Sequence, residues 1–290
     1  MPNLERRYRE TDSDFARDTT LTRPATLGRT TAPFYSGPIW RWDTVNALQI
    51  RLNAGTLASK DDLAVLGGAN ALAVQNQDGA WEIVQFATAT LTAPNEYTLT
   101  RLLRGQQGSE GAMRSPLAAG ARVVLLDDTL QQLSLGEAQA RLPFHYRWGP
   151  SGKPLSDPSW QDATLQFQAT GLIPFAPYRV RGAWTAAGDL MITWRRRDRS
   201  PAASAWDRVA GPLSETTEAY DLEITDGAGT VKRTFAAVAA PQQLYTAAQQ
   251  AADFPSGLPN PLPNPLIVNL YQLSSVLGRG RRKTESLYVR

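Results

Sequence analysis

The chain has 290 residues, of which 42% are hydrophobic and 20% charged, a globular composition with room for about two domains. Its formal net charge of +3 is too small and too dispersed for a dedicated nucleic-acid binder. Cysteine is absent, which excludes disulfides, thiolate metal sites and cysteine nucleophiles.

Residues 1–33 carry mixed charges and then several threonines, with few large apolar side chains. This pattern predicts an extended N-terminal arm that becomes ordered only against a neighbouring subunit. The first residues lack the apolar core of a signal peptide, and no stretch reaches the roughly 18 apolar residues of a membrane span. We therefore expect no membrane insertion.

The stretch AWEIVQFATATLTAPNEYTLTRLLRG, residues 80–105, organises the next domain. Its near-alternation around a Pro94-Asn95 turn predicts an antiparallel hairpin, with Trp81 and Tyr97 as core anchors. Further strands are predicted on either side of it, and residues 61–71 predict either a short helical turn or a β-turn region. Together they predict a β domain over residues 34–150, with these further strands: 47–52, 71–75, 121–127, 130–135 and 142–148.

A segment rich in proline, glycine and serine follows residue 149 and predicts a boundary. We expect a linker over 151–172, with a bridging strand at 163–169. From 173 to 290, short strands and turn signals such as Asp226-Gly227 predict a β-sandwich. The tandem LPNP repeat at 258–265 predicts a stiff surface loop, with a peptide ligand for an aromatic groove as the alternative. The strands of the sandwich are expected at 178–184, 190–194, 220–224, 230–235, 266–273 and 285–289.

Several segments carry a resemblance to a known family. EIVQFATATLTAPNEYTLTRLLRGQQGSEGAM, at 82–113, resembles the C-terminal region of the tail-tip hub ("megatron") proteins of gene transfer agents and related siphophages. The same region is similar to FYSGPIWRW with GTLASKDDLAVLGGANALAV, to FHYRWGPSGKPLSDPSW, and to the last hundred or so residues. The second domain resembles a fibronectin type III domain through Trp184 or Trp194, the strand LIVNLYQLS, and VLGRG before a final strand. The larger domains that precede this region in the family do not precede Phe34 here.

The sequence contexts of the histidine and of the paired carboxylates indicate structural rather than catalytic roles. His145, the only histidine, stands in a predicted strand, and no Gly-x-Ser-x-Gly motif accompanies it. Adjacent carboxylates on a strand point to opposite faces, so Asp61-Asp62 and Asp127-Asp128 are interpreted as turn and cap residues. We therefore predict no catalytic activity, no cofactor and no metal site. An enzyme on a β scaffold is the weakest hypothesis.

Two groups of residues are candidates for surface binding. Four tryptophans stand in loop-like contexts, and two basic clusters lie at 195–199 and 279–283, where anionic groups or an acidic subunit face are the expected contacts. Solvated loops and core packing are the alternatives. The candidates are Trp40, Trp42, Trp160, Trp206, Arg279, Arg281 and Arg282.

The resemblance implies a structural virion protein of the tail tip or baseplate, contributing to tail-tip assembly and host-cell attachment. It also implies synthesis in the bacterial host cytoplasm, three copies around the tail axis, and contacts with other tail-tip and hub proteins and with a host receptor or glycan. Nucleic acid is not expected as a partner. The alternative function is a pair of carbohydrate-binding modules without catalytic activity.

Overall fold

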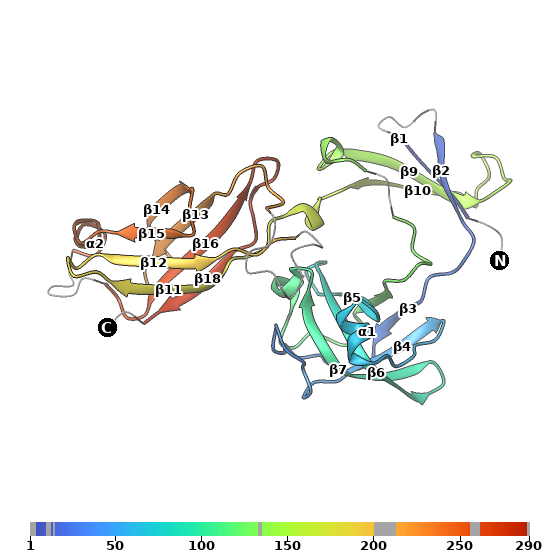
Figure 1. The fold of residues 1–290 in the computed structure, drawn as a ribbon. Helices are drawn as coiled ribbons and strands as arrows, with labels where there is room; N and C mark the ends of the chain where they lie inside the picture. Colours follow the sequence, from blue (N-terminus) through green and yellow to red (C-terminus); the bar gives the residue numbers. More distant parts are fainter. Residues whose placement is uncertain are drawn as a thin grey trace. The chain divides into compact units, whose positions relative to one another are not determined.

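The computed structural model describes residues 4–9, 13, 15–132, 135–199, 213–255 and 262–288. Strands take 45% of the chain and helices 8%, so the predicted mainly-β class is confirmed. The chain divides into two compact units, Met1–Ala169 and Thr170–Arg290 (Figure 1). Among the described residues, no helix combines the length and apolar character needed to cross a membrane.

The larger part of the first unit is a closed antiparallel barrel. Its core contains Ile50, Leu72, Phe86, Leu99 and Val123, among others, all essentially removed from solvent. A short helix, α1 (Asp62–Leu66), contacts β6 outside this core. Around the barrel the strands follow the order β3 (Leu27–Thr30), β4 (Leu48–Ala54), β7 (Glu96–Gln106), β6 (Trp81–Ala93), β5 (Ala71–Gln75) and β8 (Arg122–Leu125).

The predicted hairpin is confirmed as β6 and β7, the longest strands described, but one predicted anchor is wrong. Tyr97 is buried in the barrel core, whereas Trp81 is 38% exposed. The face of β6 that enters the barrel carries Glu82, Val84 and Phe86 instead. The near-alternation that begins at Trp81 predicts the tryptophan on the inner face, which is the opposite of the face that Trp81 occupies.

The structure corrects the extended arm predicted for residues 1–33. β3 lies in that range and closes the barrel, because it pairs with β4 on one side and β8 on the other. Thr30 is 3% exposed, and its backbone N–H donates to the carbonyl of Ala121 at 2.9 Å. Gly28 approaches its neighbour so closely that a Cβ would lie 2.4 Å from the carbonyl oxygen of Arg51.

A second sheet of the first unit also uses the N-terminal residues. β1 (Leu4–Arg9) pairs with β2 (Ala16–Leu21) on one side and with β9 (Pro143–Pro150) on the other. β9 pairs in turn with β10 (Gln161–Gln166), so the predicted bridging strand belongs to this sheet rather than to a linker. The first unit therefore runs through the predicted linker as far as Ala169.

Short 3₁₀ turns occur at Ser109–Ala112 and Glu137–Gln139 in the first unit and at Thr170–Leu172 in the second.

The second unit is a sandwich of two antiparallel sheets. One sheet has the order β11 (Tyr178–Trp184), β12 (Leu190–Arg195), β15 (Gln242–Tyr245). The other has the order β14 (Val231–Val238), β13 (Tyr220–Thr225), β16 (Leu266–Ser274), with β17 (Gly278–Arg279) and β18 (Lys283–Leu287) both pairing with β16. The first, second and fifth strands thus oppose the third, fourth, sixth and last, which is the strand order of a fibronectin type III domain.

The inward side chains of both sheets form one core. Trp194 meets Tyr220 edge-on, with ring centroids 5.2 Å apart. β16 alternates buried and half-buried positions along its whole length, as a strand of a sandwich does. β15, β17 and the helix α2 (Ala247–Asp253) had no counterpart in the sequence prediction. α2 begins with a capping box formed by Thr246 and Gln249, a local signal that was present in the sequence.

Two truncations test the role of the N-terminal strands. Removing residues 1–30 deletes β3, which leaves the barrel open between β4 and β8, so we expect the unfolding transition of the barrel to weaken or vanish. Removing residues 1–22 deletes β1 and β2 from the second sheet but leaves β3 in place, so it should preserve the transition of the barrel. Urea unfolding followed by tryptophan fluorescence measures both. An unchanged transition in the longer deletion would show that β3 is dispensable.

Candidate interaction surface

The segment between β3 and β4, residues 31–47, crosses the barrel surface and is fixed at two points. Phe34 and Leu117 exchange backbone hydrogen bonds of 2.9 and 2.7 Å, and Asp43 and Leu102 exchange bonds of 2.8 and 2.9 Å. We call this segment the β3–β4 loop. Because both bridges attach it to barrel strands or to the loop before β8, its middle part is held between two anchors.

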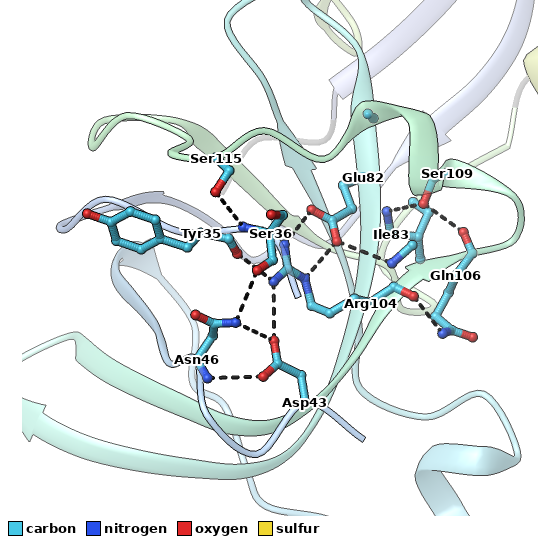
Figure 2. Close-up of polar contacts among 12 residues, drawn as sticks. Tyr35, Ser36, Asp43, Asn46, Glu82, Ile83, Arg104, Gln106, Ser109 and Ser115 are labelled. Carbon is cyan, nitrogen blue, oxygen red and sulfur yellow. Dashed lines mark hydrogen bonds and ion pairs between the residues drawn. The ribbon is translucent and has the colours of Figure 1, made fainter. Parts of the chain in front are cut away.

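A buried arginine fixes the middle of the loop. Arg104, on β7, donates from Nε and Nη2 to the two carboxylate oxygens of Glu82 at 2.8 and 3.0 Å. Its Nη1 donates to the carbonyl of Tyr35 at 2.8 Å and lies 3.4 Å from Oδ2 of Asp43. Figure 2 shows the guanidinium between Glu82 on the barrel and the two loop residues. Arg104, Asp43 and Glu82 are all at least 96% buried.

The charges of this cluster are compensated by hydrogen bonds as well as by ion pairs. Asp43 accepts from the side chain of Asn46 at 2.8 Å, and from the backbone N–H groups of Asn46 and Val45. Burial alone raises the pKa of the Asp43 carboxyl, but these bonds and the charge of Arg104 outweigh it, so the pKa lies below its ordinary value of 3.8. Asp43 is therefore ionised at neutral pH although it is fully buried.

The loop also packs tightly against the guanidinium. The ring of Phe34 lies 3.9 Å from Cζ of Arg104, within the range of a cation–π contact. At Gly37 a Cβ atom would fall 2.0 Å from Oδ2 of Asp43, so a side chain has no room there. The cluster has no opening for a substrate among the described residues, and its chemistry is that of a structural clamp.

The clamped loop presents apolar side chains to solvent. Tyr35 is 54% exposed, Trp40 62% and Val45 91%. We call these three residues the aromatic face. Trp40 has a φ of 70°, a left-handed conformation that is uncommon for a bulky residue and requires support from the surrounding structure.

Trp42 connects the loop to α1. It is half-buried against a small cluster that includes Val65 of α1 and Leu103 of β7, and the guanidinium of Arg101 lies 4.7 Å from its ring. Arg101 in turn pairs with Asp62. On the same helix Leu63 is 81% exposed and Leu66 47%. Apolar surface is thus exposed on the helix that Trp42 contacts as well as on the loop.

The structure does not bring the predicted site residues together. Trp40 is 62% exposed, Trp42 is half-buried, and Trp160 is buried, so Trp40 is the most accessible of the three. Trp206 lies outside the described residues. The remaining candidates, Arg279, Arg281 and Arg282, belong to the second unit.

The three candidate arginines all have contacts within the second unit, and the side chain of Arg282 interacts with Tyr271. Arg279 pairs with Asp221 at 2.7 Å and Glu223 at 2.5 Å and lies 4.7 Å above the ring of Tyr271. Arg281 is half-buried, and its backbone N–H donates to the carbonyl of Pro174. Arg282 is exposed. The cluster at 279–283 is therefore largely a packing element of the sandwich.

The residues weighed for catalysis have local partners. Nδ1 of His145, on β9, lies 3.1 Å from the hydroxyl of Thr164 on β10. Asp61 caps α1 by accepting from the N–H of Ala64 at 2.8 Å, and Asp127 accepts from the N–H of Thr129 at 3.0 Å, which confirms their predicted cap and turn roles. No group of three or more histidine, aspartate or glutamate residues suited to a metal ion occurs in the described parts of the chain.

Replacing Arg104 with alanine tests the clamp. The change leaves two buried carboxylates without their cation, and breaking a buried pair typically costs about 3–5 kcal/mol. We expect a loss of that size in the free energy of unfolding of the first unit, measured by urea titration. Arg51→Ala is the matched control, because the Arg51–Glu96 pair is largely exposed on the arginine side and should contribute little. Equal losses for the two variants would contradict the clamp.

Acid titration tests Asp43. Its folded pKa is lowered, so its contribution is complete above the unfolded value of about 3.9 and is lost as the pH falls through the lower folded value. We expect the stability of the first unit to fall as the pH drops below about 4. Asp43→Asn should start less stable at pH 7 and lose less on acidification. Parallel pH profiles for the two proteins would show that Asp43 is not coupled to folding.

In comparison with known proteins, the barrel matches one family model. Residues 25–124, about a third of the chain, match the family model described as Rcc01698-like, C-terminal. The chain matches no curated protein. Among solved structures, the chicken CNTN1 FN1-FN3 domains share 14% identity over 90% of this chain and 67% of theirs, with a TM-score of 0.26. Titin domains A168-A170 share 6% identity over 91% of this chain and 99% of theirs, with a TM-score of 0.24, and neither likeness bears on function. The name of the matching family is associated with gene transfer agents, so residues 25–124 indicate a protein related to phages or gene transfer agents.

Proposed function

We propose that the protein is a structural component of a phage or gene-transfer-agent-like particle, and that the aromatic face is an assembly surface. The observation that carries the proposal is the clamp itself: a buried, fully paired arginine holds an exposed tyrosine and tryptophan in one fixed loop. Preorganised aromatic side chains lose little entropy on binding and are the residues most enriched at the energetic centres of protein interfaces.

The family match supports this proposal. Its residues 25–124 contain the β3–β4 loop together with Glu82 and Arg104, so the clamp and the presented face both lie within the matching segment. The resemblance to hub proteins suggests the finer setting. On that basis the protein sits at the tail tip, in three copies around the axis, beside other tail-tip and hub proteins, and contributes to attachment to the host cell.

A carbohydrate-binding pair built on exposed tryptophans has less support. Of the four tryptophans considered for sugar stacking, Trp160 is buried, Trp42 is covered on one side by Arg101, and Trp206 is outside the described residues. A stacking platform needs open ring faces near one another. The clamped face on the barrel suits a protein partner better, and we propose a non-catalytic role.

Particle incorporation tests the assembly surface. In a strain that makes the particle, Trp40→Ser should fold normally and yet enter purified particles at least tenfold less than the native chain, since a hot-spot truncation costs roughly 2 kcal/mol or more. Tyr288→Ser is the control, because Tyr288 is an exposed aromatic residue of the second unit.

Immunoblotting of purified particles against a major particle protein gives the readout, and thermal unfolding of each isolated variant checks folding. Normal incorporation of Trp40→Ser would refute the assembly role of the aromatic face. Absence of the native chain from particles would refute the structural function as a whole.

A further inference from the structure

The outward face of the three-stranded sheet of the second unit carries a basic groove. Its volume is about 400 Å³, and it opens to solvent. We call it the arginine groove. It is lined by Arg179 and Arg181 of β11, Thr193, Trp194 and Arg195 of β12, and Pro241 and Gln242 at the start of β15.

Strand register explains why these side chains meet. Arg181 pairs with Thr193, and Thr193 pairs with Gln242, so the three form one row across the sheet. Neighbouring strands are about 4.8 Å apart, so the row spans roughly 10 Å. Arg195 follows Thr193 by two residues and therefore points to the same face, while the intervening Trp194 enters the core.

Arg179 is the third arginine of the groove. It stands two residues before Arg181, and the alternation of side chains along a strand favours the same face for both. The register of β11 against β12 shifts between Tyr178 and Arg181, and Arg179 has a left-handed φ of 51°. Both arginines line the groove.

The groove arginines differ from the other arginines of this unit. Arg279 pairs with Asp221 and Glu223, Arg233 with Asp253, and Arg199 with Glu215. In contrast, Arg179, Arg181 and Arg195 are exposed, and none of them makes an ion pair with a carboxylate among the described residues. Among the described residues, no acidic side chain lines the groove. Three like charges thus face one cavity without internal compensation.

The remaining lining residues limit the class of ligand. The hydroxyl of Thr193 and the amide of Gln242 both donate and accept hydrogen bonds, which suits the hydroxyl groups of a sugar. A peptide would need side-chain pockets, and the exposed lining offers one apolar residue, Pro241. A single nucleic-acid strand would need exposed aromatic rings, and Trp194 is only 3% exposed.

We propose that the arginine groove binds an anionic polysaccharide, with the guanidinium groups on carboxylate or phosphate groups and the Thr193–Gln242 pair on hydroxyl groups. Guanidinium forks match both oxyanions in two-bond geometry. This proposal names the class of ligand for the host attachment proposed above, and its biological role rests on that proposed function. Its physical basis lies entirely in the second unit, so a binding experiment on the isolated full chain tests it separately from assembly.

The experiment measures binding of the full chain to oligogalacturonate and to phosphomannan by isothermal titration, with neutral dextran as the uncharged reference. Binding of either anionic glycan, weakened by added salt and absent for dextran, is the expected result. The double variant Arg181→Gln with Arg195→Gln should raise the Kd at least tenfold. Both residues are exposed, so thermal unfolding of the variant should match that of the native chain.

The matched control is Arg282→Gln with Arg51→Gln, which removes the same net charge from exposed positions outside the groove. It should bind as the native chain does. Equal losses in both double variants would reduce the effect to net charge and overturn the site, as would failure to bind either anionic glycan. Poly-L-glutamate or a single-stranded oligonucleotide binding more tightly than both glycans would overturn the ligand class. These outcomes do not depend on particle incorporation.

Discussion

The first unit depends on one buried cation that has to be neutralised where it stands. Arg104 is 1% exposed, so its charge needs partners inside the protein. Its partners come from the neighbouring strand β6 and from the β3–β4 loop. Detaching the loop would leave the cation and Glu82 in place but would remove Asp43 and the Tyr35 carbonyl. The loop is therefore energetically part of the barrel although it has little regular structure.

This constraint also explains where interpretation of the sequence succeeded and where it failed on β6 and β7. The alternation of apolar residues and the Pro94-Asn95 turn are local signals, and they correctly predict a hairpin. The choice of face is not local. Glu82 enters the barrel because Arg104, on the partner strand, compensates it, whereas Trp81 stays partly in solvent. Rules of burial that treat each charged side chain alone assign the wrong face to such a strand.

The pairing of the N-terminal strands and the arginine groove could not be predicted from local sequence patterns, because both depend on contacts between distant residues. β3 reads Leu-Gly-Arg-Thr, too short and polar to predict a strand, and it becomes one because its backbone pairs with residues some 20 and 90 positions away. The groove arises when Arg181 is set beside Thr193 and Gln242 by pairing across three strands. Arg179 and Arg181 alternate along the sequence, which was the one available signal of a basic strand face. Of the two basic clusters that the sequence singled out, the one at 195–199 contributes Arg195 to the groove. Arg199 and Arg279 form internal ion pairs.

Arg104 of the barrel is buried, whereas the three arginines of the groove are exposed. We therefore assign Arg104 to the stability of its unit and the groove arginines to ligand recognition. In the barrel the cation of Arg104 is buried, so removing it from its ion pairs lowers the free energy of unfolding. On the outward face of the sandwich the cations are hydrated, and their mutual repulsion is weakened by solvent and salt. These arginines are exposed, whereas the core that holds the two sheets together consists of buried residues such as Trp194, Tyr220 and Leu270. Substitutions at the groove can consequently change the charge presented to a ligand while leaving the sandwich intact, whereas a substitution at Arg104 changes the barrel and the aromatic face together.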